Sequence, residues 1–291
     1  MTTPVSRAAG AGEPVEPVVQ VEDLHVHLRS RDDRGRSHDL AVVAGVSFDI
    51  ARGETLGLVG ESGCGKTTLV RTLFGLNPIH SGTVRILGQD MARATRTQRR
   101  QVLPRIQMVF QDPYTALDPR LSAHDIVAEP LRINRRYDRA RVVELVEAVG
   151  LDESALGRRP AAFSGGQRQR LGIARALALE PDLVVLDEPV SALDVSVQAQ
   201  VVNLLQDLQR RLGVAYLFIA HDLSVVRHLS DRVAVMERGR FVETGTRDDI
   251  FTRPRHDFTR SLLAAVPVPD PHRRTPRAAR SLSHPEKAAR P

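Results

Sequence analysis

The sequence predicts an α/β fold in which a mostly parallel sheet is covered by helices on both faces. Three stretches, TLGLVG, DLVVLDE and VAYLFIAHD, have the unbroken apolar character of strands buried on both sides. They alternate with helical patterns, which is typical of strand–helix–strand units. The 291 residues, 42% apolar and 26% charged, suit one large α/β domain or two small ones.

The N-terminal part of the chain is predicted to be rich in strands. Residues 1–16 are small and dotted with Pro and Gly, which predicts a disordered leader rather than a signal peptide. Residues 18–28 and 40–50 have the content of strands, and the polar stretch RSRDDRGRSHD between them predicts a loop. After the turn ARGE, the strand 55–60 enters a glycine loop and the helix KTTLVRTLFG. GTVRILG and residues 105–110 predict two further strands.

The middle of the chain predicts a helical insertion. SAHDIVAEPLRI and DRARVVELVEAVG show helical spacing, and SGGQRQRLGIARALALE predicts a helix with Ser164 as its N-cap. An amphipathic helix, SVQAQVVNLLQDLQRRLG, follows later, and RVAVMERGRFVETG predicts a hairpin around Arg238-Gly239. We therefore expect one domain at 17–253 with a helical subdomain at about 112–172, then a C-terminal segment at 254–270 and a basic, disordered tail at 271–291.

Composition excludes several classes of function. No apolar run approaches the roughly 18 residues that span a bilayer, which predicts a cytoplasmic protein. Cys64 is the only cysteine, so an internal disulfide and a Cys₄ metal site are excluded. The net charge is +6, but the tail supplies +5 of it, from Arg273, Arg274, Arg277, Arg280, Lys287 and Arg290 against Glu286. We expect no specific nucleic-acid partner, while weak attraction of the tail to anionic lipid stays open.

The stretch GESGCGKT matches the phosphate-loop pattern G-x-x-x-x-G-K-[ST], with a strand before it and a helix after it. Backbone N–H groups of such a loop and the helix N-terminus form a nest for the β- and γ-phosphates of a nucleotide. Of 41 basic residues only Lys66 and Lys287 are lysines, so a compact ammonium at Lys66 is informative. The predicted nucleotide-binding residues here are Gly60, Glu61, Ser62, Gly63, Cys64, Gly65, Lys66, Thr67 and Thr68.

Within this loop, Thr67 is expected to offer its hydroxyl to Mg²⁺, and Cys64 is interpreted as a small residue. Two adjacent carboxylates follow the strand in LVVLDEP. Because successive side chains of a strand point to opposite faces, Asp187 and Glu188 are expected to do different work. Asp187 suits the Mg²⁺ shell beside Thr67, and Glu188 would polarise the water that attacks the γ-phosphate. Taken alone, an apolar run followed by two acids fits an ordinary strand end equally well.

These motifs together resemble those of the ATP-binding cassette (ABC) ATPases. FSGGQRQR resembles the signature sequence of that family, and it lies between the glycine loop and LDEP as the family requires. Gln111 in VFQDP, the turn Ser191–Asp194 and His221 at the end of VAYLFIAH are further matches. The resemblance covers about residues 18–269. It implies a P-loop cassette with a RecA-like, mostly parallel core sheet, an antiparallel β subdomain and a helical subdomain.

The resemblance also implies a role for each matching residue. Gln111 would contact Mg²⁺ and the attacking water. His221 would hydrogen-bond the γ-phosphate and help to position Glu188, and Asp194 would bridge to a second ATPase subunit. The signature residues would face the γ-phosphate held by that second subunit, in a two-fold interface; they are Ser164, Gly165, Gly166 and Gln167.

One position departs from the family. ABC ATPases usually stack adenine on an aromatic residue of the first strand, and here Leu28 stands at that position beside His27. Stacking on the imidazole of His27 and an apolar contact with Leu28 both remain open. The selectivity for ATP over GTP is therefore open as well.

Two segments, VFQDPYTALDPR and PRHDFTRSLLAAVPVPDP, resemble the oligopeptide/dipeptide/nickel group of ABC importers. This implies an ATPase at the cytoplasmic face of the cell membrane, working with a second ATPase subunit, two membrane permeases and, indirectly, an extracytoplasmic solute-binding protein. Peptide is the first expectation for the solute, and nickel or another small solute is the alternative. A soluble ABC ATPase is disfavoured because the chain has one cassette without a heptad insertion, and an exporter is disfavoured by the C-terminal segment.

Overall fold

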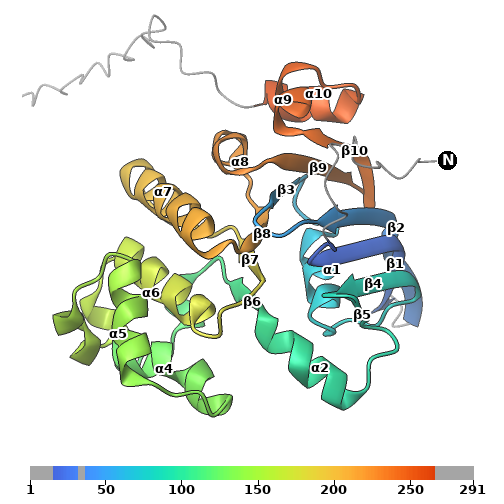
Figure 1. Ribbon diagram of the computed structural model, residues 1–291. Coiled ribbons are helices and arrows are strands. Elements are labelled where there is room, and N and C mark those ends of the chain that lie inside the picture. The colour runs from blue at the N-terminus through green and yellow to red at the C-terminus, as the bar shows by residue number, and fades with distance from the viewer. Residues whose placement is uncertain (1–15, 32–36, 266–291) are drawn as a thin grey trace, which may run out of the picture.

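The computed structural model describes residues 16–31 and 37–265, which form two sheets with helices packed against them (Figure 1). The predicted leader lies outside these ranges apart from Glu16, and the predicted tail lies outside them entirely. The larger sheet has six strands in the order β10-β9-β3-β8-β7-β6, and all except β10 run parallel. The predicted α/β fold with a mostly parallel sheet is confirmed.

The parallel strands of the larger sheet are buried on both faces. Along β7 (Leu183–Asp187), Leu183 and Val185 join one hydrophobic cluster, whereas Val184 and Leu186 join the other. This alternation follows from the two-residue period of a strand, and burial on both faces accounts for the unbroken apolar runs. The other strands of this sheet are β3 (Thr55–Val59), β6 (Ile106–Val109), β8 (Ala215–Ile219), β9 (Arg232–Glu237) and β10 (Arg240–Thr246).

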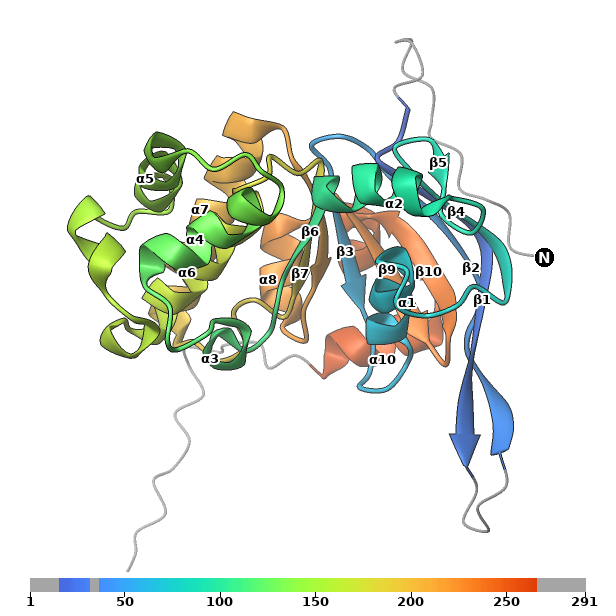
Figure 2. The ribbon, with the colours of Figure 1, turned by 90° about the horizontal axis from the view of Figure 1, so that it is seen from below.

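The smaller sheet is antiparallel, and its first two strands are longer than predicted. In place of the loop predicted for RSRDDRGRSHD, β1 continues to Arg31 and β2 starts at Ser37, so that Arg29 pairs with Asp39. Opposite charges on facing positions favour such a ladder, although the stretch is polar. Figure 2 shows this hairpin projecting from the body of the protein. The strands, in the order β2-β1-β4-β5, are β1 (Val19–Arg31), β2 (Ser37–Ile50), β4 (Ser81–Ile86) and β5 (Gln89–Asp90).

The predicted helical insertion between β6 and β7 is confirmed. Its apolar residues, among them Ile126, Leu145 and Leu171, are buried together. Its last helix continues beyond residue 172 to Leu177 and leads into β7. The segments are α3 (Pro113–Ala116), α4 (Ala123–Ile133), α5 (Arg139–Ala148), short 3₁₀ turns at Glu153–Gly157 and Pro160–Ala162, and α6 (Gly165–Leu177).

The remaining helices cover both faces of the larger sheet. α1 (Lys66–Leu73) packs between the two sheets, and α7 (Val195–Leu212) and α8 (Leu223–Leu229) pack on the opposite face (Figures 1 and 2). α2 (Arg96–Val102) lies where no element was predicted, and the 3₁₀ turn Leu103–Arg105 connects it to β6. No helix in the described ranges is both long and apolar enough to cross a membrane.

The C-terminal segment is attached to the edge strand β10 through Glu243. The predicted hairpin of β9 and β10 is confirmed, and α9 (Arg247–Thr252) and α10 (Asp257–Ala264) follow it. Glu243 accepts hydrogen bonds from the backbone N–H groups of Arg255 (2.8 Å) and His256 (3.0 Å). Partial burial opposes ionisation of Glu243, but these donors together with Thr259 lower the pKa of its carboxyl.

Candidate functional site

The glycine loop between β3 and α1 has a backbone that only glycine accommodates at two positions. At Gly60 the φ angle is 156°, and a Cβ atom would lie 2.2 Å from the carbonyl oxygen of Met236. At Gly65, the N-cap of α1, the φ angle is 115°, and a Cβ atom would lie 2.7 Å from the carbonyl oxygen of Val42. The loop backbone therefore packs directly against β9 at Gly60 and against β2 at Gly65, where there is no room for a side chain.

Lys66 is buried at the start of α1, with 7% of its surface exposed. Its Nζ donates to the carbonyl oxygens of Gly60 (2.7 Å) and Glu61 (2.9 Å), so the ammonium lies over the loop. Carbonyl oxygens orient the ammonium without neutralising its positive charge. Together with the N-terminus of α1, this charge suits an anionic phosphate.

Glu188 does not continue the strand. The prediction that Asp187 and Glu188 point to opposite faces of one strand is therefore wrong, because only Asp187 belongs to it. β7 ends at Asp187, and Glu188 has a left-handed backbone with φ 49°. Ser191 supports this turn, because its Oγ donates to the carbonyl oxygen of Glu188 (3.1 Å). A non-glycine residue in this conformation is uncommon and marks a position that the surrounding structure holds in place.

Glu188 lies between Gln111 and His221. Nε2 of Gln111 donates to Oε2 of Glu188 at 2.7 Å, and Nε2 of His221 lies 2.5 Å from Oε1. The glutamate is 9% exposed, whereas about half of the imidazole surface is exposed. Glu188 follows β7, Gln111 follows β6 and His221 follows β8. Because β7 lies between β6 and β8 in the sheet, the strand order brings the three side chains together. The structure thus brings together the three predicted catalytic side chains.

The burial of Asp187 beside Glu188 favours a cation at this edge of the sheet. Burial raises the pKa of the Asp187 carboxyl, and the negative charge of Glu188 raises it further, while the charge of Lys66 lowers it. The three predicted metal-binding residues, Thr67, Gln111 and Asp187, all offer oxygen atoms, which Mg²⁺ prefers. Because Gln111 uses Nε2 for Glu188, its Oε1 stays available. The residues present fit Mg²⁺.

The signature residues form the start of α6, away from the glycine loop of the same chain. Oγ of Ser164 accepts from the backbone N–H of Gln167, and Oε1 of Gln167 accepts from the backbone N–H of Ser164 (3.0 Å), which confirms the predicted N-cap. Figures 1 and 2 place α6 and α1 on opposite sides of β6 and β7. These residues are therefore not brought to the phosphate site of their own chain.

Asp194 caps α7 next to the signature residues. Its Oδ1 accepts from Oγ of Ser196 (2.7 Å) and from the backbone N–H of Val197 (3.0 Å), and these donors lower the pKa of the carboxyl. A Cβ atom on Gly166 would lie 2.3 Å from Cγ1 of Val197, so the starts of α6 and α7 are in close contact. Asp194 itself is exposed.

At the position expected to contact adenine, the two candidate side chains face different surroundings. Leu28 is partly buried and packs against the hydrophobic cluster between the sheets. The ring of His27 stacks on the ring of His80, with 3.8 Å between ring centroids and 13° between ring planes. No sequence pattern pointed to His80, because it lies in a loop between α1 and β4.

Comparisons with known proteins agree with this geometry. Residues 43–191 match the family model described as ABC transporter, and residues 242–290 match the model described as oligopeptide/dipeptide transporter, C-terminal region. The oligopeptide transport ATP-binding protein OppD of Mycobacterium tuberculosis is 52% identical over 239 residues, which cover 81% of this chain but 39% of that protein. OppF of Escherichia coli, an oligopeptide transport ATP-binding protein, is 49% identical over 263 residues, which cover 87% of this chain and 79% of that protein. The chain thus spans well under half the length of OppD.

Solved structures give the same result. The ATP-binding cassette MJ0796, in a dimeric post-hydrolysis state bound to ADP and Pi, matches with a TM-score of 0.68 and 26% identity, covering 78% of this chain and 98% of that chain. The protein cbiO1 from Clostridium perfringens, part of an ABC transporter complex, matches with a TM-score of 0.71 and 27% identity, covering 81% and 91%. The chain therefore has the ABC ATPase fold and belongs to the ABC transporter ATP-binding proteins of the oligopeptide/dipeptide family.

Proposed function

We propose that this chain is the ATP-hydrolysing subunit of a membrane importer for oligopeptides, located at the cytoplasmic face of the membrane. The observation that carries the proposal is the position of Glu188, which is held between Gln111 and His221 at the carboxyl ends of three neighbouring strands. The match of residues 242–290 and the names of the relatives favour peptide over nickel as the solute.

The arrangement suits hydrolysis by a positioned base. Glu188 takes a proton from a water molecule while the oxygen of that water bonds to the γ-phosphorus. At the same time the bond between the γ-phosphorus and the bridging oxygen of the β-phosphate breaks. Gln111 and His221 hold the two carboxylate oxygens in place. Lys66 and the loop N–H groups bind the β- and γ-phosphates. Thr67, Asp187 and Gln111 would hold Mg²⁺, which neutralises phosphate charge when bound.

A second cassette completes the site, because the signature residues do not reach the phosphate-binding loop of their own chain and contact a phosphate bound by the partner instead. The N-terminus of α6 presents a positive helix dipole to the γ-phosphate bound by the partner, and the two-fold axis returns the contact. Oγ of Ser164 accepts from Gln167, so the hydroxyl proton is available to the phosphate. Asp194 caps α7 through Oδ1, which leaves Oδ2 for the partner. The dimeric state of the ATP-binding cassette MJ0796 supports this arrangement.

Gly165→Asp is expected to abolish hydrolysis without loss of ATP binding. The new carboxylate lies at the start of α6 and repels the partner's γ-phosphate, while the glycine loop is unchanged. ATP binding is measured by calorimetry and hydrolysis by phosphate release. Gly165→Asn, with similar size and no charge, serves as the control and is expected to retain more activity. Normal hydrolysis by Gly165→Asp would show that the signature residues do not face a phosphate.

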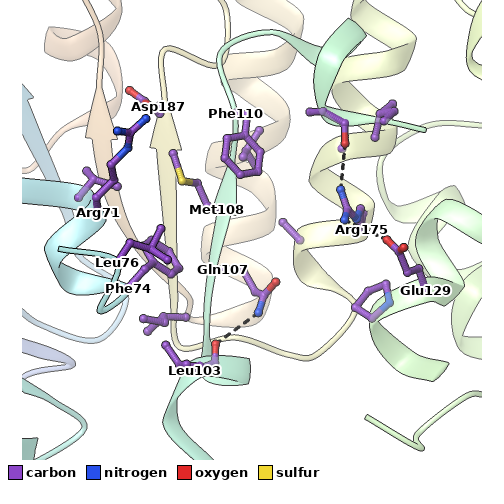
Figure 3. A pocket seen from close by; sticks show the side chains of 18 of the residues that line it. Arg71, Phe74, Leu76, Leu103, Gln107, Met108, Phe110, Glu129, Arg175 and Asp187 are labelled. Atoms are coloured by element: carbon purple, nitrogen blue, oxygen red, sulfur yellow. Dashed lines mark hydrogen bonds and ion pairs between the residues drawn. The ribbon is translucent and has the colours of Figure 1, made fainter. Parts of the chain in front are cut away.

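The membrane subunits need a docking surface, and a cavity of about 510 Å³ between α1, β6, α4 and α6 is suited to it (Figure 3). Its rim carries large apolar side chains that are strongly exposed, namely Leu76 (73%), Phe110 (50%) and Ile133 (74%). Exposed apolar groups gathered around a hollow are typical of protein-binding sites. We propose that a cytoplasmic coupling helix of one permease binds here, next to the segment that carries Gln111, and that the other permease binds the same cavity of the second cassette.

Gly172→Leu is expected to block this docking. Gly172 lines the cavity, and a Cβ atom added there has no neighbour within 4 Å, so the larger side chain fits the chain itself but fills the cavity. The tagged protein is used to retrieve permeases from detergent-solubilised membranes. Gly157→Leu is the control, because Gly157 also has open space but does not line the cavity. Equal recovery of permeases with both variants would exclude this surface, and recovery of ribosomal proteins instead would favour a soluble ABC ATPase.

A further inference from the structure

Arg175 joins three parts of the helical region at the cavity of Figure 3. It lies on α6, the helix that begins with the signature residues. Its Nη1 donates to the carbonyl oxygen of Ala116 in α3 (3.0 Å), and its Nη2 donates to Oε2 of Glu129 in α4 (2.9 Å). Figure 3 shows both bonds leaving one guanidinium group. The planar fork of arginine makes two such bonds in fixed directions, which a lysine ammonium does not.

The bond to Ala116 matters because α3 closely follows Gln111. Gln111 lies just after the end of β6, and its Nε2 donates to Oε2 of Glu188 at 2.7 Å. Fixing the carbonyl oxygen of Ala116 limits where the short segment between Gln111 and Ala116 can lie. The ion pair with Glu129 in turn holds the guanidinium in the orientation that reaches Ala116.

The face of α6 toward this segment is otherwise loosely filled. Gln169 and Gly172 precede Arg175 at one-turn intervals and line the same cavity. Gln169 is 1% exposed, and its Nε2 has no hydrogen-bond partner among the residues that the structure describes. Gly172 offers only open space. Within the described part of the chain, neither Gln169 nor Gly172 makes a directed contact with the Gln111 segment, whereas Arg175 makes one through the carbonyl oxygen of Ala116.

We infer that Arg175 is a positioning residue for hydrolysis: it couples the signature helix to Gln111 and, through Gln111, fixes the orientation of Glu188. The inference rests on the proposed function, in which Glu188 is the base. It assigns to the signature helix a second connection to catalysis, within the same chain, besides the contact of its N-terminus with the partner's phosphate. Movement of α6 when the cassettes close is transmitted by Arg175 to the Gln111 segment.

The test compares four variants of the full chain by steady-state ATP hydrolysis: Arg175→Met, Arg175→Lys, Gln111→Ala and the double variant Arg175→Met with Gln111→Ala. Arg175→Met is expected to lower kcat about tenfold or more with KM for ATP nearly unchanged, as for a misplaced catalytic group. Arg175→Lys keeps the charge and is expected to recover part of kcat. Since Arg175 acts through Gln111, the double variant is expected to be no slower than Gln111→Ala alone.

Arg141→Met is the matched control. Arg141 on α5 also makes two contacts through its guanidinium, in its case to the carboxylates of Glu144 (2.8 Å) and Glu180 (3.4 Å) and not to the Gln111 segment. It is expected to change Tm without changing kcat. If Gln111→Ala is slow but Arg175→Met hydrolyses at the normal rate, or if the two losses multiply, the inference is overturned while the proposed function stands. If Gln111→Ala hydrolyses normally, the proposed role of Gln111 fails and the inference fails with it.

Discussion

Replacing Glu188 with Gln is expected to lower the rate of ATP hydrolysis at least about a hundredfold, as for loss of a positioned general base. The amide has nearly the same size, so the turn after β7 and the contacts with Gln111 and His221 are largely kept. What is lost is the group that accepts the proton from the attacking water. ATP binding is expected to persist, since the glycine loop and Lys66 are unchanged, and the two cassettes are expected to stay closed around the nucleotide.

This result is measured as phosphate release under single-turnover conditions, together with the oligomeric state in the presence of MgATP by size-exclusion chromatography. Glu54→Gln is a matched control. Glu54 is also mostly buried and pairs with Arg232 (3.0 Å), but it precedes β3 at the opposite end of the parallel strands from Glu188. Its variant is expected to unfold at a lower temperature and to hydrolyse ATP normally. Near-normal turnover by Glu188→Gln would remove Glu188 from the role of base.

The strands of the larger sheet were predictable because burial on both faces leaves unbroken apolar runs. α2 was not predicted, because RTQRRQV has no apolar period. Its sequence signal is instead a capping box, in which Thr95 accepts from the backbone N–H of Gln98 and Gln98 accepts from that of Thr95. The ends of β1 and β2 were missed for a related reason. A two-stranded ladder held by backbone hydrogen bonds and facing charges needs no apolar pattern.

At the site, motifs identified residues but could not give their contacts. Glu188 and His221 meet only because β7 and β8 are neighbours, and strand order is a property of the whole fold. The left-handed backbone of Glu188 could not be predicted from the sequence either, since glutamate has no preference for that conformation. Arg175 is one of 39 arginines, and nothing in its spacing separates it from the others. Its position depends on three segments that fold together.

Lys66→Ala is expected to weaken ATP binding by roughly one to two orders of magnitude. A hydrogen bond to a charged group contributes about 1.5–3 kcal/mol, and each 1.4 kcal/mol corresponds to about tenfold in affinity. The loss here includes the ammonium that lies over Gly60 and Glu61, so the loop carbonyls are left without their donor as well. Hydrolysis is expected to fall further than binding, because the same charge stabilises the γ-phosphate as it is transferred.

Calorimetric titration with ATP measures the affinity, and circular dichroism verifies that the variant is folded. The chain offers a matched control in its other lysine: Lys287→Ala removes the same charge and is expected to leave the affinity unchanged. Lys66→Arg separates charge from shape. At a buried position between two loop carbonyls, a planar guanidinium does not replace a compact ammonium, so this variant is also expected to bind ATP weakly. Unchanged affinity and hydrolysis in Lys66→Ala would mean that the loop binds no phosphate, whereas full rescue by Lys66→Arg would mean that charge alone is required there.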